Sequence, residues 1–347
     1  MPNETTFVVS SSPHIRATEN TRSIMLDVCV ALSFTLLISV YSFGWRALTL
    51  TALSVVSCVF FEWAYRKLMK KDSSIGDLSA VVTGMLLSFG LSVTVPYWMV
   101  IVGAFFAIVI VKQLFGGLGH NFMNPALAAR VFLFSFPAFM NVFPNTNPGA
   151  MTEWPVWGNL PADTLDAISS ATPLSLTFMK NGVLPASEQF SPLEMLIGQM
   201  PGTLGEVSTL MLLLGGLYLV TRRVLSPRIP LYYLGTVAVL TYLFPQGGNN
   251  NLDWMLYQLL SGGLVLGAVF MATDYATTPV TKRGRTLFAI GCGALTVLIR
   301  YFGAYPEGVS FAILIMNSTT WLLDKYGLPR RFGTPRLAFL RKGDKPS

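Results

Sequence analysis

Ten long apolar stretches constrain the fold of this 347-residue chain more than any other feature of its sequence. A helix needs about 20 largely apolar residues to cross a bilayer. We therefore predict spanning helices over roughly 24–43, 47–65, 78–95, 97–115, 126–143, 204–221, 230–244, 254–272, 287–303 and 309–324. Charged residues make up only 12% of the chain, whereas soluble domains carry about 25%. The sequence predicts an all-α polytopic membrane protein and excludes a soluble enzyme.

Lysines and arginines indicate the orientation of these helices. If the N-terminus is cytoplasmic, 21 of the 24 Lys and Arg residues lie on the inner side, and only Arg46, Lys180 and Arg300 fall outside it. Positive residues are enriched in cytoplasmic loops. We expect both termini in the cytoplasm, and we assign the net charge of +7 to membrane orientation rather than to nucleic-acid binding.

The chain divides into five predicted parts. Residues 1–23 form a cytoplasmic segment, and the first span is a retained helix rather than a signal peptide. Residues 24–143 form a first membrane half, 144–203 an acidic extracytoplasmic loop with a short helix near 191–200, 204–324 a second half, and 325–347 a basic tail. After Leu78 and again after Leu260, a glycine-containing apolar stretch leads to a basic residue, glycine and a further apolar stretch. This similarity indicates two repeats, an arrangement common in transporters.

Several kinds of redox and nucleotide site lack sequence support. Cys29, Cys58 and Cys292 are isolated from one another, so we do not expect an iron–sulfur or zinc site built by this chain alone. His14 and His120 lie far apart and do not indicate a bis-histidine haem. The sequence contains no Walker A loop and no dinucleotide-binding fingerprint.

The segment Asp166–Pro173 in the outer loop resembles a flavinylation motif. At such a motif a flavin transferase joins FMN to a threonine hydroxyl through a phosphoester, which here would be Thr172. The small neighbours Ser169, Ser170 and Ala171 leave the backbone accessible to a transferase. The alternative is a Ser/Thr-rich turn that leads into a short helix.

A glycine- and asparagine-containing segment, Gly116–Arg130, lies at the inner end of the fourth predicted span. Gly116 and Gly117 permit close backbone approach to a ligand. Asn124 is placed to cap the next helix, and its amide and that of Asn121 could bind the polar edge of an isoalloxazine ring. The alternative is a well-capped loop without a ligand.

Four acidic residues are candidates for ion handling. Glu206 lies in Pro201–Thr209 at the entrance of a predicted span, where a carboxylate at membrane depth costs about 2.5–3.5 kcal/mol. Asp77, Asp274 and Asp324 lie at inner helix ends and could form a cation entry site. The alternative for each is helix capping or pairing with nearby lysines and arginines.

Taken together, the motifs resemble one family of redox-driven membrane proteins. That family comprises the D subunits of Rnf complexes, which are ion-translocating ferredoxin:NAD oxidoreductases, and the B subunits of Na⁺-translocating NADH:quinone oxidoreductases. The resemblance runs from Ser12 to about Asp324, and the short N-terminal region favours the Rnf branch. It rests on Gly116–Arg130, Asp166–Thr172, Pro201–Thr209, Met271–Asp274 and Arg300–Asn317.

This resemblance implies a urea-transporter-like fold of ten helices in two repeats, in a bacterial inner membrane. It implies covalent FMN at Thr172, non-covalent riboflavin near Asn121 and Asn124, and translocation of Na⁺ or H⁺. The implied partners are the other Rnf subunits, especially the FMN-carrying G subunit and the iron–sulfur subunits, with a flavin transferase for maturation. The alternatives are the quinone-reductase subunit and a non-redox channel or transporter, which would have no use for a flavin acceptor.

Overall fold

A computed structural model describes residues 20–140, 142–144, 172–179, 184, 191–198, 200–303 and 305–327. Every regular element in these ranges is a helix, and no strand occurs among them. The predicted all-α class is therefore confirmed for the described part of the chain.

The first half contains two long helices followed by shorter ones. In order they are α1 (Thr21–Phe43), α2 (Trp45–Leu68), η1 (Ile75–Asp77), α3 (Ser79–Phe89), α4 (Tyr97–Phe105), the π-helix η2 (Phe106–Gln113), α5 (Pro125–Leu133) and α6 (Pro137–Met140). Two short helices follow, α8 (Pro173–Met179) and α9 (Pro192–Ile197). The helix predicted near 191–200 is confirmed by α9.

The second half begins with shorter helices, and its longest helix, α14, comes near its end. It comprises α10 (Thr209–Thr221), α11 (Arg228–Leu243), α12 (Asn251–Leu260), α13 (Leu264–Leu266), the π-helix η3 (Gly267–Met271), α14 (Lys282–Phe302), α15 (Val309–Ser318) and α16 (Thr320–Gly327). Each π-helix is followed by a loop, and π-helical turns are rare but frequent at functional sites.

Several predicted spans are shorter or more broken than the sequence suggested. By length and apolarity, α1, α2 and α14 can each cross a membrane, and α12 with Leu264–Met271 forms a further pair bent by 64°. The predicted span 126–143 instead divides into α5 and α6, and 309–324 divides into α15 and α16. The bend after α12 falls at Ser261–Gly263, where Gly262 has φ of +69°, a conformation that favours glycine.

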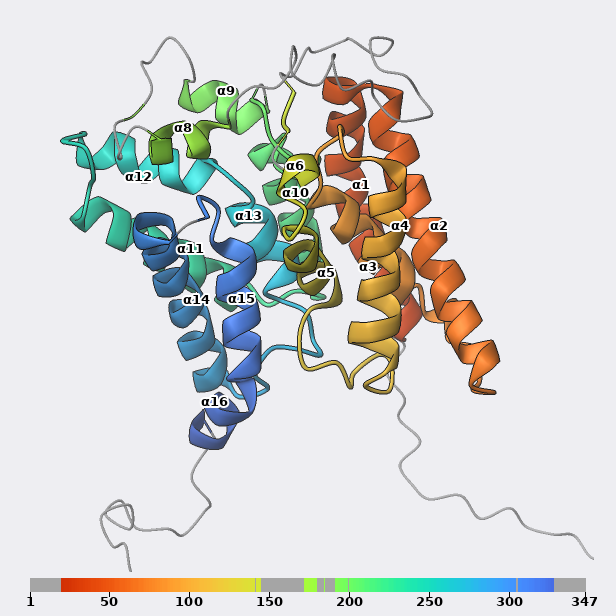
Figure 1. Cartoon of the computed structure of the whole chain (residues 1–347). Coiled ribbons are helices and arrows are strands. Elements are labelled where there is room, and N and C mark those ends of the chain that lie inside the picture. Colours follow the sequence, from red (N-terminus) through yellow and green to blue (C-terminus); the bar gives the residue numbers. More distant parts are fainter. Residues whose placement is uncertain are drawn as a thin grey trace, which may run out of the picture.

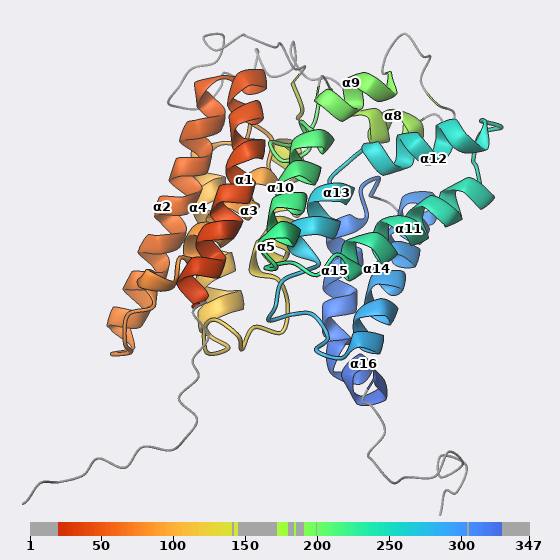
Figure 2. The same ribbon diagram turned by 180° about the vertical axis from the view of Figure 1, so that it is seen from behind.

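The helices form two groups around a set of short central helices. Helices α1, α2 and α4 lie on one side, and α11, α14 and α15 lie on the other (Figures 1 and 2). The start of α1 and the end of α16 lie at one end of the molecule, whereas α8, α9 and α12 lie at the opposite end. The start of α1 and the end of α16 thus share a side, away from α8 and α9.

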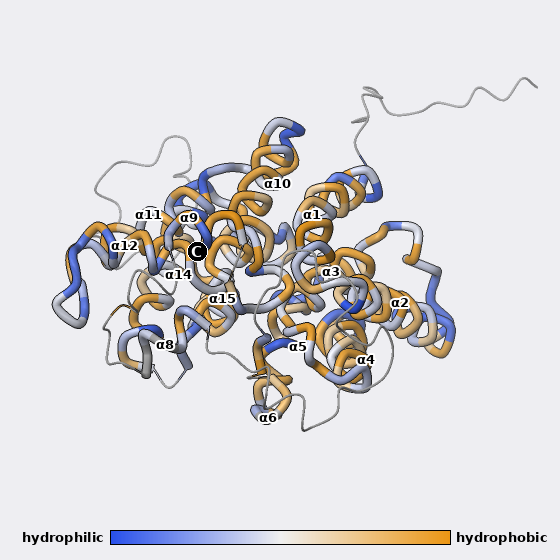
Figure 3. Tube along the Cα trace, turned by 90° about the horizontal axis from the view of Figure 1, so that it is seen from above, coloured by the Kyte–Doolittle hydropathy of each residue, from blue (hydrophilic) through white to orange (hydrophobic). Residues whose placement is uncertain are grey.

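Large apolar side chains cover the outward faces of the long helices. They include Leu37, Val56, Leu217, Leu231 and Phe302, each more than half exposed. Figure 3 shows the apolar residues along the helices and the polar ones mainly in the connections. Such extensive apolar exposure in water marks an aggregation-prone surface, so these faces suit contact with lipid or with other membrane subunits.

Candidate functional site

A cavity lies between the two helix groups, on the side that the sequence analysis predicts to be cytoplasmic, and we call it the inner cavity. Its volume is about 120 Å³, enough for several waters, since one ordered water needs about 10–15 Å³ on this scale. Polar groups on its wall include Lys112, Asn121, Asn124, Asp274 and Arg285. The structure thus brings the two predicted flavin-binding asparagines and one predicted ion-handling acid to a single cavity.

Asn124 caps α5, as its position before Pro125 predicts. Its Oδ1 accepts hydrogen bonds from the N–H groups of Ala126 at 3.0 Å and Leu127 at 3.3 Å. Its Nδ2 donates to the carbonyl of Met271 at 3.2 Å, so the cap also joins the first half to the second. Much of the hydrogen-bonding capacity of Asn124 is used inside the protein.

The loop between η2 and α5 leads into the cavity wall at Leu118 and Asn121. Gly116 and Gly117 have φ of +120° and +96°, where side chains are strained. A Cβ at Gly117 would lie 2.8 Å from an Arg66 guanidinium nitrogen. These glycines therefore shape the loop, while the Asn121 Nδ2 donates to the Met123 carbonyl at 3.2 Å.

Next to this cavity lies a buried ion pair that the sequence analysis did not assign. Lys112 Nζ is 3.1 Å from Glu62 Oε2, and their side chains are 3% and 1% exposed. Glu62 also accepts hydrogen bonds from Gln113 and Ser74, both at 2.7 Å. The sequence signal was a glutamate inside an apolar run, but nothing in the sequence identified its partner.

The three acids predicted at inner helix ends serve separate local contacts. Asp77 Oδ1 accepts from the N–H and the hydroxyl of Ser79, and that hydroxyl accepts from Lys112 Nζ at 2.6 Å. Asp324 accepts from the N–H groups of Val280 and Thr281. Within the described ranges, no three His, Cys, Asp or Glu residues gather in a way that could hold a metal ion.

Asp274 is the predicted acid that reaches the cavity. It lies in the loop after η3, outside the helices, and is half-buried. Its carboxylate accepts from the Ala276 N–H and the Thr277 hydroxyl, both at 3.4 Å. Burial raises the pKa of Asp274, and these two hydrogen bonds oppose the rise. The Asp274 carboxylate therefore lines the cavity with one long hydrogen bond on each oxygen.

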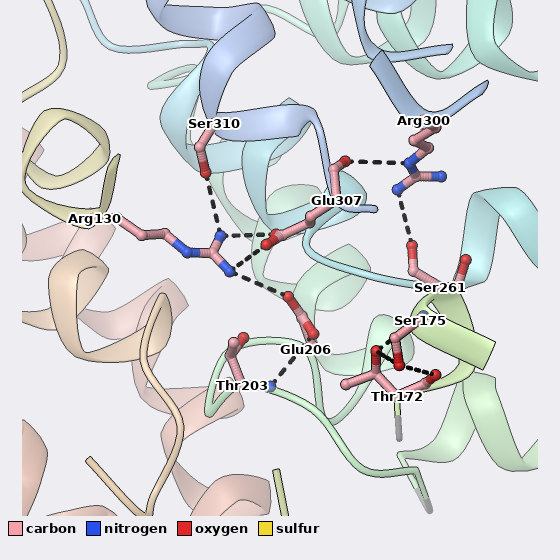
Figure 4. A network of polar contacts seen from close by, with 9 residues as sticks. All are labelled: Arg130, Thr172, Ser175, Thr203, Glu206, Ser261, Arg300, Glu307 and Ser310. Carbon is pink, nitrogen blue, oxygen red and sulfur yellow. Dashed lines mark hydrogen bonds and ion pairs between the residues drawn. The ribbon is translucent and has the colours of Figure 1, made fainter. Parts of the chain in front are cut away.

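A second polar centre, the Arg130 network, joins the two halves (Figure 4). The Arg130 guanidinium donates to the Glu307 carboxylate at 2.7 and 2.6 Å and lies 3.5 Å from Glu206 Oε1. It also lies 3.4 Å from the Ser310 hydroxyl. Arg130 is 3% exposed, so it is a buried counter-charge rather than one of the cytoplasmic charges among which we counted it.

Arg300 lies beside this network but uses its donors differently. Its guanidinium donates to the Gln258 side chain and carbonyl and to the carbonyls of Ser261 and Glu307. Gln258 and Ser261 lie at the C-terminal end of α12, where a positive charge is favoured by the helix dipole. Arg300 therefore stabilises the break between α12 and α13.

Thr172 immediately precedes α8 (Figure 4), and α8 lies at the end of the molecule opposite to the start of α1 (Figure 1). Its hydroxyl accepts from the Ser175 N–H at 3.2 Å and donates to the Ser175 hydroxyl at 3.1 Å. Thr172 is half-buried. The other predicted motif residues, Asp166, Ser169, Ser170 and Ala171, lie outside the described residues.

The start of α8 is held against the bend after α12. The Tyr257 hydroxyl donates to the Pro173 carbonyl at 2.7 Å. A Cβ at Gly262 would lie 3.2 Å from the Leu174 side chain and 3.3 Å from an Arg300 guanidinium nitrogen. The Thr172 segment and Arg300 thus meet at this bend.

Comparison with known proteins agrees with the motifs over nearly the whole chain. The NQR2, RnfD, RnfE family matches residues 8–333. The chain is 44% identical over 335 residues to the D subunit of the Na⁺-translocating ferredoxin:NAD⁺ oxidoreductase complex of Acetobacterium woodii, covering 96% of this chain and 98% of that protein. It is 40% identical to the D subunit of the proton-translocating ferredoxin:NAD⁺ oxidoreductase complex of Clostridium ljungdahlii, with 95% and 97% covered. It is also 39% identical to the D subunit of an ion-translocating oxidoreductase complex of Stutzerimonas stutzeri, with 89% and 91% covered.

Proposed function

The chain belongs to the NQR2, RnfD, RnfE family, and from that premise we propose that it is a membrane electron-transfer subunit of an ion-translocating ferredoxin:NAD oxidoreductase. In this proposal it carries FMN covalently at Thr172 and couples electron transfer to outward movement of Na⁺ or H⁺. The relatives named above include subunits of both a Na⁺-translocating and a proton-translocating complex. The proposal therefore covers both ions. The complete activity requires the other subunits of the complex.

The position of Thr172 is the observation that supports this proposal. The residue lies at a helix start, is half-buried and is held by Tyr257 through Pro173. A phosphoester on its oxygen would replace the hydrogen bond to the Ser175 hydroxyl, and the bond from the Ser175 N–H can persist because that oxygen remains an acceptor. The residues present therefore fit a tethered flavin.

FMN, when bound, supplies reversible electron transfer, and the protein supplies its position and its surroundings. Thr172 would tether the cofactor on the outer face, where free FMN would be lost by diffusion. The Tyr257 hydroxyl would fix the start of α8 relative to α12. Arg300 lies at the bend beneath this segment and adds positive charge on the side toward the membrane.

The inner cavity is the proposed location of a second, non-covalent riboflavin. Apolar side chains such as Val82, Leu86 and Phe270 line it together with Asn121 and Asp274. An apolar pocket with a few polar groups is typical of a small-molecule site, but such pockets span about 300–1,000 Å³. At about 120 Å³ the cavity would have to widen to hold a three-ring flavin. Asn121 would hold the polar edge of the ring, while Asn124 would act mainly through the cap of α5.

Ion translocation is proposed to use the acids that the sequence indicated. Moving one charge against 100 mV costs about 2.3 kcal/mol, which modest redox steps can supply. Asp274 reaches the inner cavity and is the leading candidate on that side. Asp77 and Asp324 would act there only by giving up their contacts with Ser79 and Thr281. Glu206 lies in the separate Arg130 network.

The proposed partners follow from membership in a multi-subunit complex. They are the FMN-carrying G subunit and the iron–sulfur subunits, which would deliver and accept electrons, and a flavin transferase that would modify Thr172. The proposed setting is a bacterial inner membrane with both termini in the cytoplasm and the α8–α9 region outside.

Flavin fluorescence on a denaturing gel tests the proposal directly. The chain is expressed with its flavin transferase, beside Thr172→Ala and a matched control, Thr177→Ala. The control removes another threonine hydroxyl of α8, one that donates to the Leu174 carbonyl. We expect a fluorescent band in the wild type and in Thr177→Ala, and none in Thr172→Ala.

A dark wild-type band, with a known substrate of the transferase labelled in the same cells, would refute the electron-transfer role. The non-redox channel or transporter would then be the function to test. A fluorescent band with ubiquinone-dependent rather than ferredoxin-dependent activity of the complex would instead indicate the quinone-reductase branch of the family.

A further inference from the structure

The Arg130 network contains more acid than its arginine neutralises. We propose that Glu206 and Glu307, which converge beside Gly263, form a binding site for one small monovalent cation, a proton or Na⁺, with Arg130 as its resident counter-charge. The inference rests on the proposed function in that the complex moves such a cation. The inference places the cation site away from the inner cavity and names the side chains that form it.

The charges in the network are unevenly matched. Arg130 gives both terminal nitrogens to Glu307 at 2.7 and 2.6 Å, whereas its distance to Glu206 is 3.5 Å. Arg300, the next guanidinium, donates to carbonyl oxygens rather than to a carboxylate. Glu206 is 7% exposed, and its ion pair with Arg130 is the longer of the two, so the cost of burying its carboxylate is only partly offset. A bound cation on Glu206 would remove that cost.

Gly263 provides the space between the two acids. A Cβ at this position would lie 2.7 Å from Glu307 Oε1 and 3.3 Å from Glu206 Oε1. Its φ is −73°, so the backbone conformation does not require glycine. The requirement comes from the two carboxylates, whose oxygens converge on this point. A side chain here would occupy the volume into which both acids point.

Thr203 supplies an oxygen that has no partner within the protein. The residue is 3% exposed and its hydroxyl makes no hydrogen bond. Its N–H donates to Glu206 Oε2 at 3.3 Å, and in Figure 4 its hydroxyl lies on the side facing Arg130 and Glu206. Carboxylate and hydroxyl oxygens suit a hard cation such as Na⁺, and the same hydroxyl can accept a hydrogen bond from a protonated carboxyl.

The site is linked to the inner cavity through α5. Asn124 at the start of this helix lines the cavity, and Arg130 lies further along the same helix. Six residues of α-helix span about 9 Å. A cation held by Glu206 and Glu307 would therefore lie one short helix away from the cavity, at the junction of the two halves.

Thermal unfolding of the detergent-solubilised complex tests the site without ferredoxin. The midpoint for this subunit is followed in a NaCl series against choline chloride at constant ionic strength, and the series is repeated across pH. A rise with Na⁺ identifies Na⁺ as the ligand. A rise at low pH in choline chloride alone identifies a proton.

Two pairs of variants locate the effect. We expect Glu206→Gln and Gly263→Ala each to lose the wild-type dependence on Na⁺ or pH. The two controls are Asp253→Asn, which removes an exposed acid on α12, and Gly235→Ala, which places a methyl group where nothing lies within 4 Å. Both controls should keep the wild-type dependence of the unfolding midpoint on Na⁺ or pH. Full wild-type dependence in Glu206→Gln and Gly263→Ala overturns the proposal, as does a wild type that responds to neither ion.

Thr203→Val covers the case in which those variants do not assemble. It keeps the side-chain shape and removes the unpartnered hydroxyl. In Thr203→Val, the Na⁺ concentration or proton activity that gives half of the rise in unfolding midpoint should differ about tenfold from that of the wild type. An unchanged value counts against the site. Covalent flavin is read on gels of the same samples. A labelled complex without the cation effect refutes this site alone, whereas an unlabelled complex with the effect refutes the proposed electron-transfer role alone.

Discussion

Replacing Lys112 by methionine tests how strongly its buried pair with Glu62 stabilises the part of the first half beside the cavity. The two side chains lie 3.1 Å apart at 3% and 1% exposure. Removing one partner of such a pair costs about 3–5 kcal/mol, because the other charge remains buried. Glu62 would keep hydrogen bonds from Gln113 and Ser74, so we expect a value near the lower end, about 3 kcal/mol.

The double variant Glu62→Gln/Lys112→Met separates charge from packing. It removes both charges while preserving most of the volume, so it should be within about 1 kcal/mol of the wild type. Equilibrium unfolding of the full chain in detergent, followed by tryptophan fluorescence, gives the free energies for the singles and the double. If the double loses as much stability as the two singles added together, the two charges are not coupled, and the reasoning from the ion pair is wrong.

Four further variants probe the helix packing, the cap of α5 and the contact that holds the start of α8. Gly84→Ala places a Cβ 2.7 Å from the Val55 Cα, and this overpacking should lower the free energy of unfolding by about 1–3 kcal/mol in chemical denaturation. Asn124→Ala removes the α5 cap and should cost about 1–2 kcal/mol, whereas Asn124→Asp, which keeps the acceptor, should lose less in the same assay. Tyr257→Phe frees the Pro173 carbonyl and should cost about 1 kcal/mol; flavin labelling at fixed expression time should fall, and unchanged labelling would show that this contact does not position the acceptor.

Features set by neighbouring residues were predictable from the sequence. The long apolar runs predicted α1, α2 and α14 because their composition suits a membrane over the length of a span. Asn124 before Pro125 predicted the cap of α5, since both residues act within one helical turn. The motifs of the wider family were also readable, and membership is shown by the match over residues 8–333.

Features that depend on distant partners were not predictable. Glu62 was visible as an acid in an apolar run, but its partner Lys112 lies on η2 rather than on α2. Arg130 was read as an inner charge because its sequence position suggests the cytoplasmic side, yet the fold brings Glu307, just before α15, to it. Asp77 and Asp324 were grouped by membrane depth. Asp77 makes a local contact with Ser79, in line with the capping alternative, whereas Asp324 contacts Val280 and Thr281, more than 40 residues away in sequence.

The sequence by itself determined the helical class, the apolar surfaces and the local caps, because periodicity, composition and turn chemistry act over a few residues. Tertiary structure decided where the spans break, which asparagines and acids share a cavity, and which carboxylates share Arg130. The physical reason is that a buried charge must find its counter-charge in space. In this chain Arg130, Glu206 and Glu307 come from three separate segments, and only packing of the two halves brings them together.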